Sequence, residues 1–178
     1  MGKTTTFRRD DQGAFPAMAG APFDVAEFLR SPRVARLSLA GPVVRPVWYL
    51  WEDQKFWVIT GPWSRLSEWL RDDPKFELVI DTCDVASGQV RQVIARGDGA
   101  LAEFEEDRGR RKLRRYLGDD EPRWDPRFRV AGAASRGTQW AVLSPRTIIV
   151  ADISFRPAIG AGHGDNTLSH SHEEASPR

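Results

Sequence analysis

Three residues near the middle of the chain, Thr60, Ser64 and Arg65, have the types and the spacing to hold an anion. They flank a Gly-Pro break, where an apolar, β-prone run ends and a stretch with apolar residues at helical spacing begins. A serine at this point can cap the helix, because its hydroxyl accepts a hydrogen bond from an amide of the first turn. Free amides at the positive end of a helix, two hydroxyls and a guanidinium together suit a phosphate group. The stretch by itself fits an ordinary capped helix with a solvated arginine slightly better than it fits a phosphate site.

The composition indicates one globular domain with no strong overall charge. The chain has 178 residues, of which 40% are hydrophobic, seven tryptophans and a formal net charge of +1. This length allows a substantial core, and the charge gives no general attraction to nucleic acids or membranes. Cys83 is the single cysteine, which excludes an internal disulfide and fits a reducing compartment. The sequence has no bilayer-length apolar run and no signal-peptide pattern, so we expect a cytoplasmic protein without a membrane or nucleic-acid partner.

Hydrophobic periodicity and turn residues predict the elements that must position these side chains. Helices are expected over 25–30, from Ser64 to the stop at Asp72-Asp73-Pro74, and over 103–117. Strands are expected over 34–39, 43–51, 55–60, 76–81, 89–102 and 138–154, the last of them broken at Ser144-Pro145. Mostly antiparallel strands with segregated helices predict a small β-barrel of the α+β class with a few flanking helices.

The two ends of the chain differ in composition from the middle. Residues 1–22 are polar and rich in Gly, Ala and Pro, and we expect a flexible N-terminal arm. Residues 23–155 are the predicted folded domain. Residues 156–178 combine Gly, Ser, His and acidic residues without a periodic apolar face, so we expect a disordered C-terminal tail.

The helix expected over 103–117 carries a cluster of basic residues that could suggest a nucleic-acid site. Its acids come first and its bases later, an order that suits the helix dipole. The spacing also allows the i,i+4 ion pairs Glu106–Arg110 and Asp107–Arg111. We therefore interpret the cluster as a solvated helix face that is neutralised by its own acids.

The strand order and three stretches resemble the pyridoxamine 5'-phosphate oxidase-like flavin-binding split barrels, a superfamily that includes the deazaflavin-dependent reductases of actinobacteria. The resemblance covers about residues 23–155. In that superfamily an Arg on the second strand and the Thr, Ser and Arg of a strand-to-helix turn hold the cofactor phosphate, and the Gln of an Arg-Gln-Val strand contacts the isoalloxazine ring. The matching positions in this chain are Arg45, Thr60, Ser64, Arg65 and Gln92.

Three departures from the family pattern limit what is carried over. Leu66 follows Arg65 where the family usually has Lys, and Leu50 occupies the position of a second family Lys. The loss of two cations weakens a phosphate site. After Ile153 the chain reads Ser-Phe-Arg-Pro-Ala, without the Arg-x-His pair by which the true oxidases hold pyridoxamine phosphate. The oxidase activity itself is therefore not expected.

The resemblance implies an oxidoreductase that uses FMN, or alternatively a deazaflavin coenzyme, for hydride transfer with a small-molecule substrate. It also implies a homodimer, because these barrels build each cofactor site from two subunits. Trp48, Tyr49 and Trp140 are candidates for the pocket walls, although residues of these types are more often simply part of a core. We identify no catalytic residue and no metal site. The alternatives are a non-catalytic flavin- or haem-binding carrier or sensor and, third, a cofactor-free interaction barrel.

Overall fold

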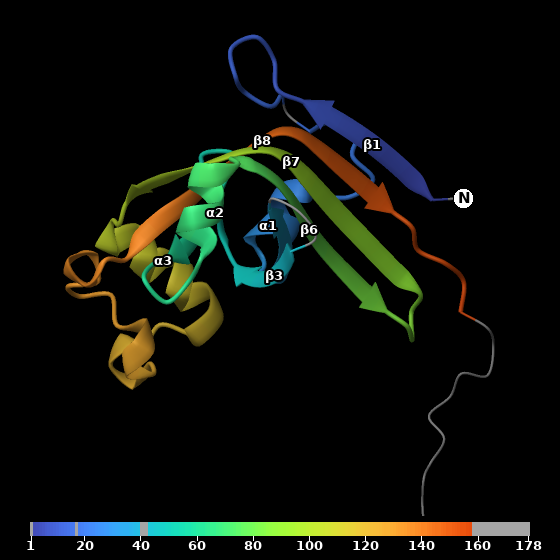
Figure 1. The fold of residues 1–178 in the computed structure, drawn as a ribbon. Helices are drawn as coiled ribbons and strands as arrows, with labels where there is room; N and C mark the ends of the chain where they lie inside the picture. The colour runs from blue at the N-terminus through green and yellow to red at the C-terminus, as the bar shows by residue number, and fades with distance from the viewer. Residues whose placement is uncertain (1, 17, 40–42, 158–178) are drawn as a thin grey trace, which may run out of the picture.

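The computed structural model describes residues 2–16, 18–39 and 43–157. In this part of the chain, eight strands form one sheet in which all paired neighbours run antiparallel, accompanied by three α-helices (Figure 1). The predicted α+β class is confirmed. The strands are β1 (Lys3–Arg8), β2 (Val34–Leu39), β3 (Val43–Trp48), β4 (Leu50–Glu52), β5 (Lys55–Thr60), β6 (Lys75–Asp84), β7 (Gln89–Glu103) and β8 (Gln139–Asp152). The helices are α1 (Val25–Arg30), α2 (Leu66–Asp72) and α3 (Glu106–Leu117), and short 3₁₀ turns follow at Glu121–Arg123, Pro126–Phe128 and Ala134–Arg136.

The sheet curls so that its two edges are joined at a single residue, Tyr49. The strand order is β3-β2-β6-β7-β8-β5-β4, so β3 and β4 lie at opposite edges although they are consecutive in the chain. Only Tyr49 separates them, and it is completely buried. The strand predicted over 43–51 is therefore two strands, because the chain leaves one edge and enters the other at this point. The result is a half-closed barrel, and the split barrel that the resemblance implied is confirmed.

The N-terminal residues are part of the fold, which corrects the flexible arm predicted over 1–22. Strand β1 pairs with β8 from Lys3 opposite Asp152 to Arg8 opposite Thr147. Phe7 is buried in the main core. The run of three threonines before that phenylalanine is β-prone, but its pairing partner is far away in the sequence. The tail predicted over 156–178 lies, from residue 158 onward, outside the described residues.

The break predicted at Ser144-Pro145 is a β-bulge inside one continuous strand. Gly97 of β7 lies opposite Pro145 of β8, whereas Arg96 lies opposite Thr147, so Arg146 is the extra residue. A central strand tolerates proline at a bulge, where the missing N–H does not interrupt the ladder. A side chain at position 97 would collide with the backbone of β8, which explains the glycine there.

The helix predicted over 25–30 is confirmed, whereas the one predicted over 103–117 begins only at Glu106, because Glu103 is still the last residue of β7. Asp24 caps α1 by accepting a hydrogen bond from the amide of Glu27 at 2.9 Å. The β4–β5 hairpin turns through Asp53 and Gln54, both with positive φ, as two-residue hairpins of this kind require. The main core fills the curl of the sheet. A second apolar cluster joins the other end of the sheet to α3 and to residues 121–136, which contain the three 3₁₀ turns and are called the 3₁₀ segment below.

The ends of the fold are distinct in Figure 1. Helix α3 and the 3₁₀ segment lie at one end of the molecule, whereas the β6–β7 hairpin tip and the exit of the chain after β8 lie at the other. No helix in the described ranges is long and apolar enough to cross a membrane.

Candidate functional site

A cavity of about 980 Å³ opens beside the strand-to-helix turn between β5 and α2. This volume is at the upper end of the usual range for small-molecule sites. Residues of β2, β3, β5 and α2 contribute to its walls, together with residues of α3 and of the segment that follows α3. The cavity therefore joins the middle of the chain, which the sequence analysis singled out, to α3, which it interpreted as a solvated helix face, and to the segment after α3.

The structure brings three of the five predicted site residues together. Arg45, Ser64 and Arg65 all line the cavity. Thr60 is fully buried at the end of β5, and its hydroxyl oxygen lies 3.4 Å from that of Ser67 on α2. Gln92 does not line the cavity. It lies half-buried on β7 between Asp81 of β6 and Ala151 of β8.

The two predicted arginines of the cavity share one aromatic platform. The guanidinium carbon of Arg45 lies 5.5 Å from the ring centroid of Trp69, and that of Arg65 lies 5.6 Å from the same ring. The indole therefore holds two cations near one another through cation–π attraction. Arg65 also donates to Glu68 at 2.9 Å, with 72% of its side chain exposed. Within the described ranges, Arg45 has no carboxylate partner, so an anion could pair with it directly.

The start of α2 differs by one residue from the prediction. The cap position is Arg65, which makes no side-chain capping bond, and the helix begins at Leu66. The hydroxyl oxygen of Ser64 still accepts a hydrogen bond from the amide of Leu66 at 3.2 Å. Because that hydroxyl already serves the helix and α2 is only seven residues long, the attraction for an anion here rests mainly on the two arginines.

Aromatic rings form part of the cavity wall. Trp48 lines it and is stacked between Tyr116, at 4.6 Å between ring centroids, and Phe128, at 5.5 Å. Of the three wall candidates from the sequence, Trp48 is thus the one in place. Tyr49 and Trp140 are fully buried in the core and do not line the cavity.

Lys112 is a cavity residue that the sequence analysis did not single out. It lies on α3 with 3% of its surface exposed, and it lines the cavity. Burial, with a smaller contribution from the positive charge of Arg115, lowers the pKa of its amine from 10.5 to about 7. Its sequence signal was the spacing from Gly109 through Lys112 and Leu113 to Tyr116, which is i, i+3, i+4, i+7 and marks the packed face of the helix.

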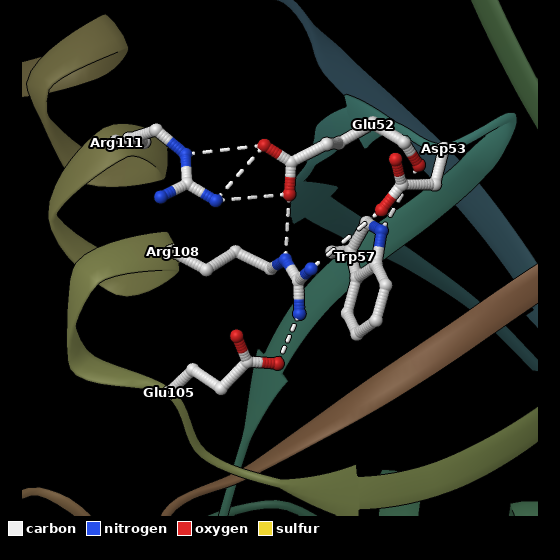
Figure 2. Close-up of polar contacts among 6 residues, drawn as sticks. All are labelled: Glu52, Asp53, Trp57, Glu105, Arg108 and Arg111. Carbon is white, nitrogen blue, oxygen red and sulfur yellow. Dashed lines mark hydrogen bonds and ion pairs between the residues drawn. The ribbon is translucent and has the colours of Figure 1, made fainter.

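Three further bases of α3, Arg108, Arg111 and Arg115, also depart from the solvated face predicted for this helix. Arg108 and Arg111 both bind Glu52 at the end of β4, as Figure 2 shows. Arg115 donates to the carbonyl oxygens of Leu29 at 3.0 Å and Tyr49 at 3.0 Å. It thereby satisfies free carbonyls at the end of α1 and at the corner between β3 and β4. These cations hold α3 against the barrel, which positions Lys112.

One of the two ion pairs predicted within α3 is present. Arg110 binds Glu106 at 3.1 Å, as the i,i+4 spacing predicts. The predicted pair Asp107–Arg111 does not form, because Arg111 reaches Glu52 and Asp107 pairs with Arg110 instead.

A curled antiparallel sheet with a cavity beside its strand-to-helix turn is the architecture of the pyridoxamine-phosphate-oxidase-like split barrels. The sequence profile of the pyridoxamine 5'-phosphate oxidase family matches residues 23–153. The chain belongs to this family. A sequence search of curated proteins finds no match.

Several solved structures are similar in fold. They include an FAD-binding protein from Mesorhizobium loti, with a TM-score of 0.56 and 16% identity over 86% of this chain and 99% of that one. A conserved hypothetical protein from Mycobacterium tuberculosis has a TM-score of 0.55 and 21% identity over 74% of this chain and 87% of that one. The flavocytochrome Anf3 from Azotobacter vinelandii has a TM-score of 0.51 and 16% identity over 94% of this chain and 89% of that one. At these identities the similarity shows the shared split barrel.

Proposed function

We propose that the cavity binds a flavin-type cofactor, FMN or a deazaflavin coenzyme, and that the protein is an oxidoreductase acting on a small molecule. The observation that supports this most directly is the convergence of Arg45, Ser64 and Arg65 on one cavity with an aromatic wall at Trp48. Two guanidinium groups suit a phosphate, and the apolar side of an aromatic wall suits a flat ring system. Two proteins of similar fold, an FAD-binding protein and a flavocytochrome, point to the same class of ligand.

The residues of this chain would bind and orient the cofactor. Arg45 and Arg65, held by Trp69, would pair with its phosphate, and Thr60 would support the turn through its contact with Ser67. The bound cofactor would supply the hydride-transfer chemistry. The apolar and aromatic part of the wall would keep water away from the ring.

Binding of FMN or a deazaflavin at micromolar concentration is the first expected result, followed as a change in cofactor fluorescence. Arg65→Ala should weaken this binding about tenfold, the usual effect of losing a charge-assisted contact. Arg123→Ala is a matched control, because Arg123 is also an exposed arginine and does not line the cavity. If neither cofactor binds, the proposal is wrong. If Arg65→Ala behaves like the control, Arg65 is only a solvated helix residue.

The protein is also proposed to be a homodimer. Gln92 lies outside the cavity of its own chain, so its contact with the cofactor ring would depend on a second copy. Val44 and Trp63 are large apolar residues that remain 59% and 66% exposed in the single chain, and aromatic residues are enriched at interfaces. Light scattering at micromolar concentration should therefore report about twice 20.0 kDa. A mass of one chain would contradict the dimer and leave Gln92 without a role in the site.

Turnover distinguishes the enzyme from the non-catalytic alternative. A protein that binds the cofactor without ever passing electrons to or from a second compound would be a carrier or a sensor. Reduction of the bound cofactor, followed by screening of small molecules for its reoxidation, is the measurement that separates these functions.

A further inference from the structure

The side chain of Lys112 is the buried cation of the cavity that has no partner. Among the described residues, the amine makes no hydrogen bond and no ion pair, although 97% of the residue is removed from solvent. Lys75, in contrast, binds Asp98 at 2.5 Å on the surface. Burial of an unpaired amine is unfavourable, and such groups are concentrated at functional sites. The ordinary alternative is a lysine that packs its stem and remains neutral.

The charged residues that line this cavity with Lys112 are all basic. The basic residues that line the same cavity come from β3, α2 and the segment after α3, and Arg115 lies one turn along α3. Within the described part of the chain, the cavity lining contains no carboxylate. Two of the lining arginines have acidic partners outside the lining, since Glu68 binds Arg65 and Asp125 binds Arg127. The basic lining residues are Arg45, Arg65, Lys112, Arg127, Arg129 and Arg136.

We propose that Lys112 binds an anionic oxygen of the substrate, from a carboxylate or a phosphate, at a place in the cavity distinct from the Arg45–Arg65 pair. The inference rests on the proposed function, because it assigns a substrate class to the same cavity. A cavity lined by six basic residues, only two of them paired with described acids outside the lining, and by no described acid matches an anionic ligand beyond a single cofactor phosphate. The substrate class is therefore a small anionic compound, and Lys112 is the residue that selects it.

This role has a definite pH dependence. The pKa of Lys112 is about 7, and an anion beside it favours the charged form, so binding raises that pKa. Affinity for the anion then falls as the pH rises through 7, because the free protein loses the proton. The other basic groups that face the cavity are arginines, which remain charged throughout this range. The three histidines of the sequence all lie outside the described residues.

NMR of protein labelled with ¹³C-lysine tests the inference on the full chain. The sequence contains only four lysines, so each side-chain signal can be assigned with a single Lys→Arg variant. We expect one signal, that of Lys112, to titrate near pH 7, and we expect inorganic phosphate or benzoate to raise its pKa. If only phosphate raises the pKa of Lys112, the substrate is a phosphorylated compound. If only benzoate raises it, the substrate is a carboxylate. The other three lysines should not respond.

A second measurement uses binding of the same two probes at pH 6. Lys112→Met should weaken the binding of the effective probe about tenfold, whereas Arg114→Met, an exposed position on the same helix, should leave it unchanged. If neither probe moves the pKa of Lys112, the inference is wrong, even when FMN binds. If a probe raises it but neither FMN nor a deazaflavin binds, the anion site stands and the proposed cofactor function fails.

Discussion

Lys112→Met is expected to stabilise the protein at neutral pH by on the order of 4 kcal/mol. Methionine matches the length of the lysine stem and needs no polar partner. Burial lowers the pKa of the lysine amine from 10.5 to about 7. Each unit of that shift corresponds to about 1.4 kcal/mol of preference for the unfolded chain, where the amine holds its proton in water. Removal of the amine should therefore raise the free energy of unfolding.

The sign of the effect can be checked by varying the pH. Between pH 7 and about 10 the unfolded chain binds more protons at this position than the native protein, so the wild type becomes more stable as the pH rises. Urea unfolding at pH 7 and pH 9.5 should show the advantage of Lys112→Met shrinking with pH. Arg114→Met, on the exposed face of α3, is the control for the loss of one positive charge. A variant that is less stable than the wild type at pH 7 would refute the expectation.

Glu52→Ala is expected to destabilise the protein by about 2 kcal/mol, because it removes the charged hydrogen-bond partner of Arg108, a guanidinium that is largely shielded from water. Arg108 binds Glu52 at 2.6 Å with only 12% of its own side chain exposed, and its guanidinium lies 3.7 Å from the ring centroid of Trp57. Figure 2 shows that Arg111 binds the same carboxylate from the next turn of α3. Without Glu52, the guanidinium groups of Arg108 and Arg111 lie against the barrel with one fewer negative charge to balance them.

A surface pair of the same chemistry is the matched control. Arg96 and Glu77 form a two-bond pair across β6 and β7, with 55% and 41% of their side chains exposed. Glu77→Ala should change the free energy of unfolding by less than about 1 kcal/mol, as exposed pairs do. Chemical unfolding of both variants gives the comparison. Equal changes in the free energy of unfolding would mean that the shielding of the Glu52 network from water adds nothing to stability.

Acid should weaken the same network. Burial alone would raise the pKa of Glu52, but hydrogen bonds from Arg108 and Arg111 outweigh it and hold the pKa below 4.5. A carboxylate with a lowered native pKa contributes stability above its unfolded pKa and loses it as the pH falls. The contribution of Glu52 should therefore disappear below about pH 4.5, and Glu52→Gln should flatten that part of the acid unfolding curve.

The features that could be predicted from the sequence are those set by neighbouring residues. The cap at Asp24 and the turn at Asp53-Gln54 involve residues a few positions apart, so their chemistry is visible in the sequence. The same holds for the turn that carries Ser64 and Arg65. Its meeting with Arg45 in one cavity was suggested by family resemblance, and the structure shows the three lining that cavity.

The features that were missed depend on distant partners. The threonine run of β1 has no partner until β8, about 140 residues later, so polar composition alone indicated a loose arm. In the sequence, Lys112 does not stand out from the arginines around it, because so many basic residues make the apolar periodicity of α3 difficult to recognise. Only the position of the helix against the barrel, fixed by Glu52 and Tyr49, shows that this amine points inward.

The pairing of β8 has a consequence for how the chain is made. This strand bonds to β7 along its length, to β5 on the 139–143 half and to β1 on the 147–152 half. It is also the last of the described elements to leave the ribosome. Until then β1, β5 and β7 each lack a neighbour, and unpaired strand edges invite association with other chains. Synthesis must therefore reach residue 152 before the sheet can close, and a chain stalled earlier would be a natural client of chaperones.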